Sequence, residues 1–414
     1  MARILIAGGS LGGLLAANML LRDGHDVHVL EKANGSLDGR GAGIVTHAAL
    51  MQGLARAGVE VDDSIGVKVE SRVVLDEQGE SVARLQMPQI LTSWSRLYAL
   101  LYEAFPNDRH HAGFAVRRVD QDERTVRVES ESGATFEGDL LIASDGIRSV
   151  VRTQLLPDAI PKYAGYIAWR GVCDEARLSE RTLTTVFDHF AFGLPRGEQL
   201  IGYPVAGHGN VTERGKRRFN FVWYRAADEA DGLRTLMTDV GGQHHPLGIP
   251  PHKIVPAHVV EMREAAHRLL APQFAEILDQ TAQPFLQPIY DVASSRLVFG
   301  RIALMGDAAF VARPHVGMGV TKAAEDAMAL SDAVRVREGT PAALIDFEAK
   351  RLIAGQAVVE RGRKLGAYMQ AQGRRDESDA VSRDAHTVLR ETAIDLELFD
   401  RPVSEPAPTL VENV

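Results

Sequence analysis

The chain has 414 residues, of which 45% are hydrophobic and 24% charged, a composition typical of a globular protein of about two domains. Its formal net charge is −9 without a long block of like charges, which argues against nucleic acid as the main partner. The only cysteine, Cys173, rules out an internal disulfide and fits the reducing cytoplasm, where we expect the protein to be located.

The N-terminal apolar run, residues 4–21, could be read as a signal peptide or a membrane span. Glycines and Ser10 interrupt it, Arg22 and Asp23 end it, and no small-x-small cleavage site precedes them. The run is also short for a membrane-spanning helix. We therefore expect no membrane association.

The same stretch predicts a βαβ unit. Its strand, glycine-rich turn, helix and second strand fall at residues 3–7, 8–13, 14–22 and 25–31. The frame G-x-G-x-x-G falls on Gly8, Ser10 and Gly13, so a serine replaces the middle glycine. Glu31 follows about twenty residues after the turn, where an adenosine ribose hydroxyl would lie. The combination predicts a dinucleotide-binding unit.

The next stretch offers two further candidates for cofactor contact. Arg40 precedes a glycine loop, residues 41–44, which is either a backbone clasp near the cofactor or a bare loop. A helix over 46–58 and a hairpin over 67–86 follow. A further helix begins at Ser95, which we expect to cap it. Arg96 in its first turn either reaches a phosphate or is solvated.

Two more strands end at an acid and a glycine. The buried strand over residues 139–143 stops at Ser144-Asp145-Gly146, and Arg148 and Arg152 follow. The strand over 302–305 stops at Gly306-Asp307. A loop with Pro314, Gly317 and Gly319 then leads into a helix, which suits a ligand whose polar chain touches backbone. The alternative is an ordinary turn with a solvated aspartate.

The middle of the chain is rich in aromatic residues and strand-like. These strands are expected at residues 163–172, 184–194, 199–205 and 217–225, and helices at 228–240 and 257–281. The fold class is therefore α/β, with a Rossmann-type domain, an antiparallel-sheet domain and C-terminal helices. The first domain is expected to take residues 1–70, 96–158 and 287–370, the second 71–95 and 159–286, and a C-terminal helical tail 371–414.

The motifs at residues 8–13, 144–149 and 306–308 occur in the order found in group A FAD-dependent aromatic hydroxylases, which include para-hydroxybenzoate hydroxylase. The amino-acid sequences at residues 41–45, 163–171 and 313–315 most resemble the branch that contains 2,6-dihydroxypyridine 3-hydroxylase. The resemblance implies FAD bound by one Rossmann-type domain, with NADH or NADPH as co-substrate and no second nucleotide domain. It further implies O₂ and hydroxylation through a flavin C4a-hydroperoxide.

By resemblance, Glu31 would hold the adenosine ribose, the first turn the pyrophosphate, Arg96 the cofactor chain and Asp307 the ribityl chain. Asp145 belongs to a motif with a dual role toward FAD and NAD(P)H. The expected cofactor-binding residues are Gly8, Gly9, Ser10, Leu11, Gly12, Gly13, Glu31, Lys32, Arg40, Gly43, Arg96, Asp145, Gly306, Asp307, Pro314, Gly317, Met318, Gly319 and Val320. Many family members have Gly-Gln-Gly-x-Asn where this chain has Gly317-Met-Gly-Val-Thr321, so backbone N–H groups would contact the isoalloxazine ring.

Five residues are candidates for contact with the substrate. Tyr203, Tyr224 and His189 lie on the predicted sheet, His47 follows the glycine loop, and His315 lies in the flavin-side loop. His315 is the leading candidate for an acid or base, because the pKa range of histidine suits neutral pH. The alternatives are structural histidines and packing aromatics. We expect no metal site, because the paired histidines of the chain lack ligand spacing.

The predicted function is hydroxylation of a small hydroxylated aromatic or N-heteroaromatic ring, with a hydroxypyridine as the specific candidate. A urate-type or phenolic-acid hydroxylase is the alternative, and a flavin reductase or a ligand-binding flavoprotein is more remote. The chain has no Trp-x-Trp-x-Ile sequence, which disfavours a halogenase. A homodimer is left open.

Overall fold

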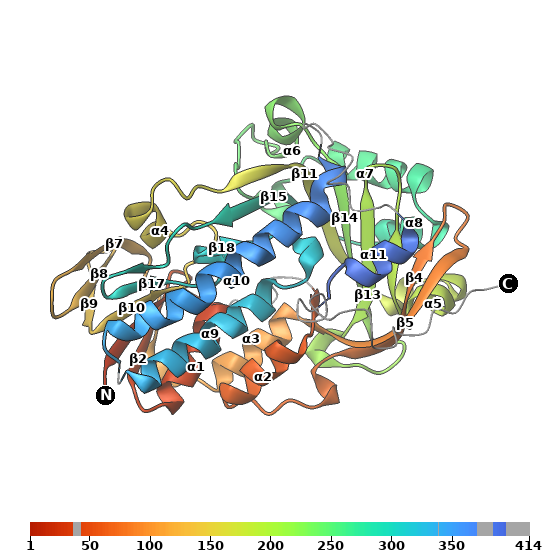
Figure 1. Ribbon diagram of the computed structural model, residues 1–414. Helices are drawn as coiled ribbons and strands as arrows, with labels where there is room; N and C mark the ends of the chain where they lie inside the picture. Colours follow the sequence, from red (N-terminus) through yellow and green to blue (C-terminus); the bar gives the residue numbers. More distant parts are fainter. Residues whose placement is uncertain (36–42, 338, 371–383, 395–414) are drawn as a thin grey trace.

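The computed structural model describes residues 1–35, 43–337, 339–370 and 384–394. Within them, one sheet has six strands in the order β16-β17-β10-β1-β2-β6 (Figure 1). These are β1 (Arg3–Ala7), β2 (Asp26–Glu31), β6 (His110–Ala112), β10 (Leu140–Ala143), β16 (Val298–Phe299) and β17 (Ile302–Leu304). All its pairs are parallel except β16 with β17. The loops after β1, β10 and β17 therefore leave the same edge of the sheet.

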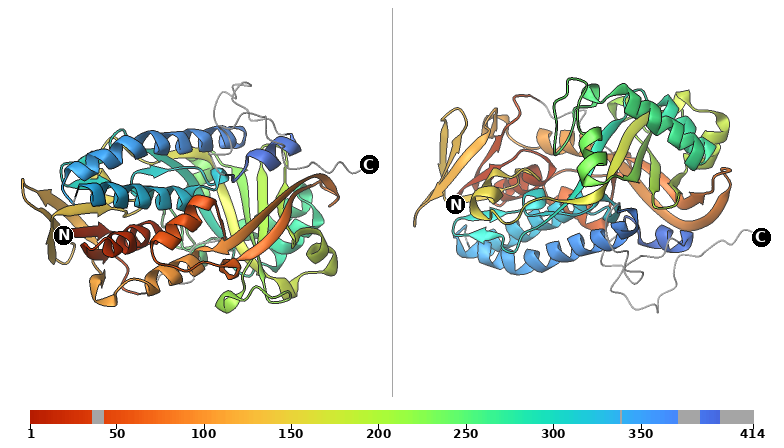
Figure 2. Two further views of the ribbon diagram at one scale, coloured as in Figure 1. Left: turned by 60° about the horizontal axis from the view of Figure 1, so that its bottom comes forward. Right: turned by 90° about the horizontal axis from the view of Figure 1, so that it is seen from above.

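Helices cover the first sheet and explain its apolar strands. The long α9 (Gly319–Val336) packs on α1 (Leu11–Arg22), α2 (Ala48–Arg56) and α10 (Ala342–Gly366), and α1 also contacts α3 (Trp94–Glu103). Figure 2 shows α1, α9 and α10 running side by side along this layer. Every residue of β10 is buried, as expected for a central parallel strand covered on both faces.

A small antiparallel sheet lies at the far end of the first layer from the second sheet (Figure 1). Its strands are β7 (Val116–Gln121), β8 (Val126–Ser130) and β9 (Thr135–Gly138). The short helix α4 (Val150–Leu155) packs against β7, and β9 contacts β1, so this sheet is attached to the first layer.

The second large sheet has nine strands among the described residues, in the order β18-β15-β11-β14-β13-β12-β4-β5-β3. These are β3 (Gly43–Val45), β4 (Val67–Leu75), β5 (Ser81–Ser93), β11 (Lys162–Asp174), β12 (His189–Gly193), β13 (Gln199–Val205), β14 (Arg218–Ala226), β15 (Phe285–Ala293) and β18 (Phe310–Val311). One face packs with α5 (Glu180–Val186), α7 (Pro256–Leu269) and α8 (Pro272–Gln280) in a core that includes Trp169 and Trp223. The other face forms a core with C-terminal residues and includes Tyr166, Tyr203 and Tyr224.

The fold class is confirmed, and so is the hairpin, formed by β4 and β5. Two predicted element starts were wrong. Residues 184–186 end helix α5 instead of starting a strand, because the Ser179 hydroxyl accepts a hydrogen bond from Thr182 N and caps that helix. The cap of α3 is Ser93 rather than Ser95, since Ser93 Oγ accepts from Arg96 N at 3.1 Å.

After residue 228, each of the two helices predicted from the sequence is divided into shorter elements in the structure. A π-helical turn, Glu229–Leu233, and α6 (Arg234–Leu236) replace a single helix over 228–240. Pro272 begins a separate helix within 257–281, because proline lacks the N–H that a continuous helix requires. The predicted tail helix is present as α11 (Ala385–Glu391).

Arg72 on β4 holds the C-terminal segment against the second sheet. Its guanidinium is fully buried, and Nη1 donates to Leu389 O at 2.8 Å and to Thr392 O at 2.6 Å, while Nη2 donates to Ala393 O at 3.0 Å. Ala393 N in turn donates to His315 O at 2.8 Å. Burial lowers the pKa of Arg72 to about 9, so it remains charged at neutral pH.

None of the helices in the described part of the chain combines the length and the apolar character needed to cross a bilayer.

We expect Arg72→Met to lower the free energy of unfolding by roughly 3 kcal/mol, because buried carbonyls lose a charged donor. Urea denaturation of the variant and the wild type measures the difference. Arg127→Met, at an exposed position on β8, is the control. Equal losses in both variants would show that Arg72 does not hold the C-terminal segment.

Candidate functional site

The turn between β1 and α1 requires glycine at two positions. Gly8 has φ +98°, and a Cβ there would lie 2.4 Å from Ser144 O. A Cβ on Gly13 would lie 1.9 Å from Gly8 O. Ser10 stands at the N-cap of α1 and its side chain makes no cap hydrogen bond. The first N–H groups of α1 lack intrahelical partners, so the turn offers a cradle for an anionic group.

Glu31 at the end of β2 is hydrogen-bonded to this turn. Its carboxylate accepts from Gly9 N at 2.7 Å and from Ala33 N at 2.8 Å, and each oxygen keeps a lone pair for a further donor. A cavity of about 440 Å³ lies beside it. The predicted residues in its wall are Gly8, Ser10, Glu31, Lys32 and Asp145. Trp94, Phe114 and Val116 also line this cavity, and no sequence pattern had indicated them.

Asp145 follows β10 and faces the same cavity. Its Oδ2 accepts from Val150 N at 2.8 Å, while its buried Oδ1 has no hydrogen-bond partner among the described residues. Burial raises the pKa of this carboxyl. Arg152 connects the loop after β10 to the turn after β17, because its Nη1 donates to Ala308 O at 2.9 Å. Its Nε donates to Ala159 O at 2.9 Å.

The Gly306–Ala308 turn after β17 is fixed by a buried ionic network. Gly306 N donates to Asp326 Oδ2 at 3.0 Å, and Arg351 Nε donates to Asp326 Oδ1 at 2.6 Å. Lys322 is completely buried, with Nζ 3.5 Å from Asp326 Oδ2. The Asp307 side chain is accessible to solvent although protein surrounds it. Desolvation raises the pKa of its carboxyl, and the charge of Lys322 opposes this increase.

The loop before α9 prepares a second open helix terminus. Pro314–Val316 forms a 3-10 turn, and Gly317 then takes the left-handed conformation with φ +67°. Met318 is buried and Val320 half-buried. Gly319 begins α9, and the space around the position of a Cβ there is open to 4 Å. The backbone at Gly319 can therefore be approached by a flat ligand.

His315 lies in an aromatic cluster on the second sheet. Its Nε2 is 2.8 Å from Tyr166 Oη, and its ring centroid is 4.1 Å from that of Tyr224. Its Nδ1 has no hydrogen-bond partner in the described part of the chain, and the residue is only 1% exposed. Burial, assisted by the charge of Arg313, lowers the pKa of His315 to about 3, so the ring is neutral at pH 7. Tyr166 was not predicted as a site residue.

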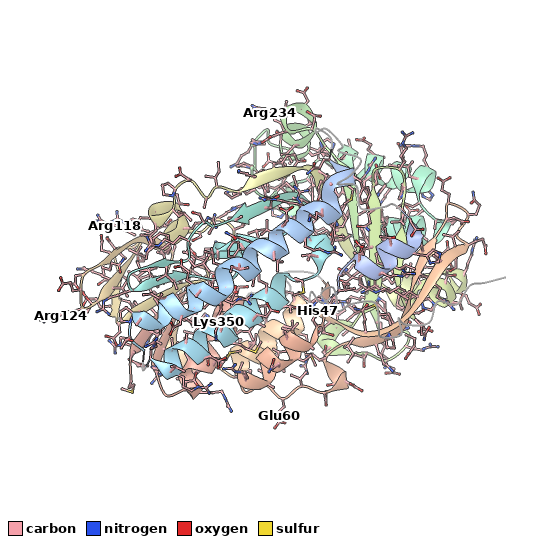
Figure 3. All side chains as sticks on the ribbon, viewed as in Figure 1. His47, Glu60, Arg118, Arg124, Arg234 and Lys350 are labelled. Carbon is pink, nitrogen blue, oxygen red and sulfur yellow. The ribbon has the colours of Figure 1, made fainter. Side chains whose placement is uncertain are left out.

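Tyr203 and His47 also lie where the two layers meet. Tyr203 stacks on Phe190, and a Cβ on Gly43 would lie 2.3 Å from its ring. His47 directly precedes α2 (Figure 3), with Nδ1 2.8 Å from Oγ1 of Thr321 in the first turn of α9. Burial raises the pKa of Tyr203 to about 12, so its hydroxyl stays protonated near neutral pH.

His189 is not brought into this group. Its Nδ1 is 2.9 Å from Ser71 Oγ and its Nε2 is 3.0 Å from Arg84 Nη2. The next residue, Phe190, packs on Tyr203, so the alternation of a strand directs His189 to the opposite face.

Arg96 lies in the wall of a second cavity, of about 600 Å³, together with Gly43, Val172, His208 and Arg218. The Arg96 Nε atom is buried and has no partner among the described residues. Arg40, the remaining predicted contact, lies outside the described residues. No group of three or more potential metal ligands occurs within the part of the chain that the structure describes.

The low pKa of His315 predicts an acid sensitivity. The unfolded chain protonates this histidine below about pH 6.5 while the folded protein does not, so stability falls as pH falls from about 6.5 toward 3. Between about pH 7.5 and about pH 5, His315→Gln should lose about 2 kcal/mol less unfolding free energy than the wild type. Urea denaturation at both values tests this. His244→Gln, at an exposed position, should behave as the wild type; a His315 variant that does the same would contradict the assignment.

Comparison with known proteins agrees with this geometry. A family model described as an FAD binding domain matches residues 1–192, and one described as FAD binding domain-like matches residues 163–291. The chain is 34% identical to 2,6-dihydroxypyridine 3-monooxygenase of Paenarthrobacter nicotinovorans, over 90% of this chain and 92% of that protein. It is 26% identical to an FAD-dependent urate hydroxylase of Klebsiella pneumoniae, over 87% and 89%.

Among solved structures, 2,6-dihydroxypyridine-3-hydroxylase from Arthrobacter nicotinovorans has a TM-score of 0.84 and 32% identity, covering 92% of this chain and 96% of that one. The glycine cradle, the carboxylate of Glu31 and the open helix terminus at Gly319 fit a dinucleotide that carries a flat ring. The chain therefore belongs to the group A flavoprotein monooxygenases, the FAD- and NAD(P)H-dependent enzymes that hydroxylate aromatic and heteroaromatic rings.

Proposed function

We propose that the enzyme hydroxylates a small N-heteroaromatic ring that carries hydroxyl or oxo groups, with a hydroxypyridine as the first candidate. The observation that carries the proposal is the 34% identity, along nearly the whole chain, to a relative named for 2,6-dihydroxypyridine. The relative named for urate also acts on an N-heterocycle and keeps a urate-type substrate as the second candidate.

We further propose how the chain holds its cofactor. Glu31 would accept hydrogen bonds from the adenosine ribose, and the N–H groups of residues 8–13 would bind the pyrophosphate. Arg96 would neutralise a phosphate charge. Asp307 would accept from ribityl hydroxyls, and the backbone of residues 317–320 would face the isoalloxazine ring. Bound FAD would supply electron transfer from NAD(P)H and the activation of O₂.

Substrate binding would be the role of one face of the second sheet, the face that carries Tyr203 and Tyr224. The ring would lie beside Tyr203, Tyr224 and His315, whose side chains are at most 6% exposed, so that bulk water is kept from the reacting atoms. The tyrosine hydroxyls, which burial keeps protonated, would orient ring oxygens. Since His315 is neutral, its free Nδ1 would serve as a hydrogen-bonding group rather than as a stored proton. The proposal includes a cytoplasmic location, supported by the single, buried Cys173.

Asp307→Ala should weaken FAD binding about tenfold or more, because a carboxyl acceptor of hydroxyl hydrogen bonds is lost. Reconstitution of the apoprotein, followed by flavin fluorescence, gives the dissociation constant. Glu60→Ala is the control, since Glu60 lies at the surface away from the loops (Figure 3). A yellow variant with wild-type FAD affinity would remove Asp307 from the cofactor site.

The substrate class is tested with 2,6-dihydroxypyridine, urate and 3-hydroxybenzoate. We expect the pyridine to give the highest kcat/KM for NAD(P)H oxidation, with O₂ uptake and a product that has gained one oxygen atom. Mass spectrometry of the product identifies true hydroxylation. NAD(P)H oxidation that yields only hydrogen peroxide with every ring, or the highest kcat/KM with 3-hydroxybenzoate, would contradict the proposal.

A further inference from the structure

Arg170 and Asn220 share one face of the second sheet with the substrate-facing tyrosines. In the β11–β14 pair, Ala168 lies opposite Tyr224 and Val172 opposite Asn220, while Tyr203 on β13 lies opposite Asn220. Directly paired residues share a face, and so do residues two apart on a strand. Arg170, between Ala168 and Val172, is therefore on this face and diagonal to Asn220.

Asn220 has one half of its amide engaged and the other half free. Its Oδ1 accepts from Gly43 N at 3.1 Å, which connects the sheet to the first strand after the glycine loop. Its Nδ2 is buried and has no hydrogen-bond partner among the described residues, although the side chain is only 1% exposed. Buried donors are seldom left without a partner, so this N–H pair points to a missing acceptor.

Arg170 also has a buried donor without a hydrogen-bond partner, and its guanidinium carries a full positive charge. Its Nη1 donates to Gln287 Oε1 at 2.8 Å, and its guanidinium lies 5.7 Å from the Phe285 ring centre. Its Nε is buried without a partner, and no carboxylate within the described residues forms an ion pair with it. By contrast, Arg225 on the opposite face of the sheet is paired with Glu198 at 3.1 Å.

The charge of Arg170 acts on this face. It opposes the burial that raises the pKa values of both Tyr203 and Tyr224. The cavity of about 600 Å³ lies next to this place, because its wall includes Gly43, whose N–H donates to Asn220, and Val172, which is paired with Asn220. A small anionic ring on this face would meet two donors, and no carboxylate among the described residues forms an ion pair with the charged one.

We propose that Arg170 and Asn220 form a donor pair that binds an ionised hydroxyl oxygen of the heteroaromatic substrate. The inference rests on the proposed function and adds which residues of this chain hold the ring oxygen. Binding the ionised form favours loss of the hydroxyl proton and enriches the ring in electrons, which hydroxylation requires. Gln287, which positions the guanidinium, belongs to the same arrangement.

The FAD-loaded enzyme is titrated with 2,6-dihydroxypyridine, and binding is followed by the change in flavin absorbance. Arg170→Met should raise the dissociation constant about tenfold or more, and Arg170→Lys, which keeps the charge, should raise it less. Asn220→Asp is nearly isosteric but replaces a donor with a negative acceptor, so it should weaken binding at least as much. Arg177→Met, at an exposed position in the 3-10 turn that follows β11, is the matched control.

Two further readouts separate binding from folding. FAD affinity should be unchanged in all variants, which shows that they fold. The ultraviolet spectrum of the bound pyridine should show its ionised form at a lower pH in the wild type than in Arg170→Met. If the dissociation constants of Arg170→Met and Asn220→Asp stay within about twofold of the wild-type value, the donor pair is contradicted but the proposed function is not. A wild-type enzyme that binds neither this pyridine nor urate would instead reject the proposed function.

Discussion

The arrangement of the site depends on one buried carboxylate. Asp326 accepts hydrogen bonds from the Gly306 backbone and from Arg351, and lies next to the buried ammonium of Lys322. A charge removed from water is costly unless partners surround it, so Asp326 tolerates few positions of its neighbours. It thereby fixes the turn after β17 relative to α9 and α10. The position of Asp307 follows from that turn.

The second constraint is the contact between the two layers. The loop before α9 contacts the antiparallel sheet through His315, whose Nε2 is 2.8 Å from Tyr166 Oη, and the C-terminal segment is held against that sheet by Arg72. The backbone of His315 accepts from Ala393, so the loop before α9 is held from two sides. Segments that are far apart in the sequence thus meet at the place where we propose that the ring binds. Reactive oxygen chemistry needs a water-poor space, because water competes for every charge in it.

Electrostatics divides the substrate face into neutral and positive parts. Burial keeps His315 neutral and the tyrosines protonated, while Arg170 brings a charge that no carboxylate among the described residues balances. An enzyme that hydroxylates an electron-rich ring would gain from this division, because in our proposal the positive part orients the ring oxygen and the neutral part packs against the ring carbons.

The sequence alone determined the features that depend on near neighbours. The β1 turn, Glu31, and the turns at Asp145 and Asp307 were predictable, because a strand, a glycine turn and a helix specify their backbone within a few residues. The contacts of Tyr166, Asn220 and Arg72 were not, since each depends on strand register or on contacts between residues far apart in the chain. His189 shows the same limit: its residue type suited the site, but the pleat of β12 directs it away. Only tertiary structure decides which polar atoms are buried without a partner, because burial depends on the packing of the whole chain.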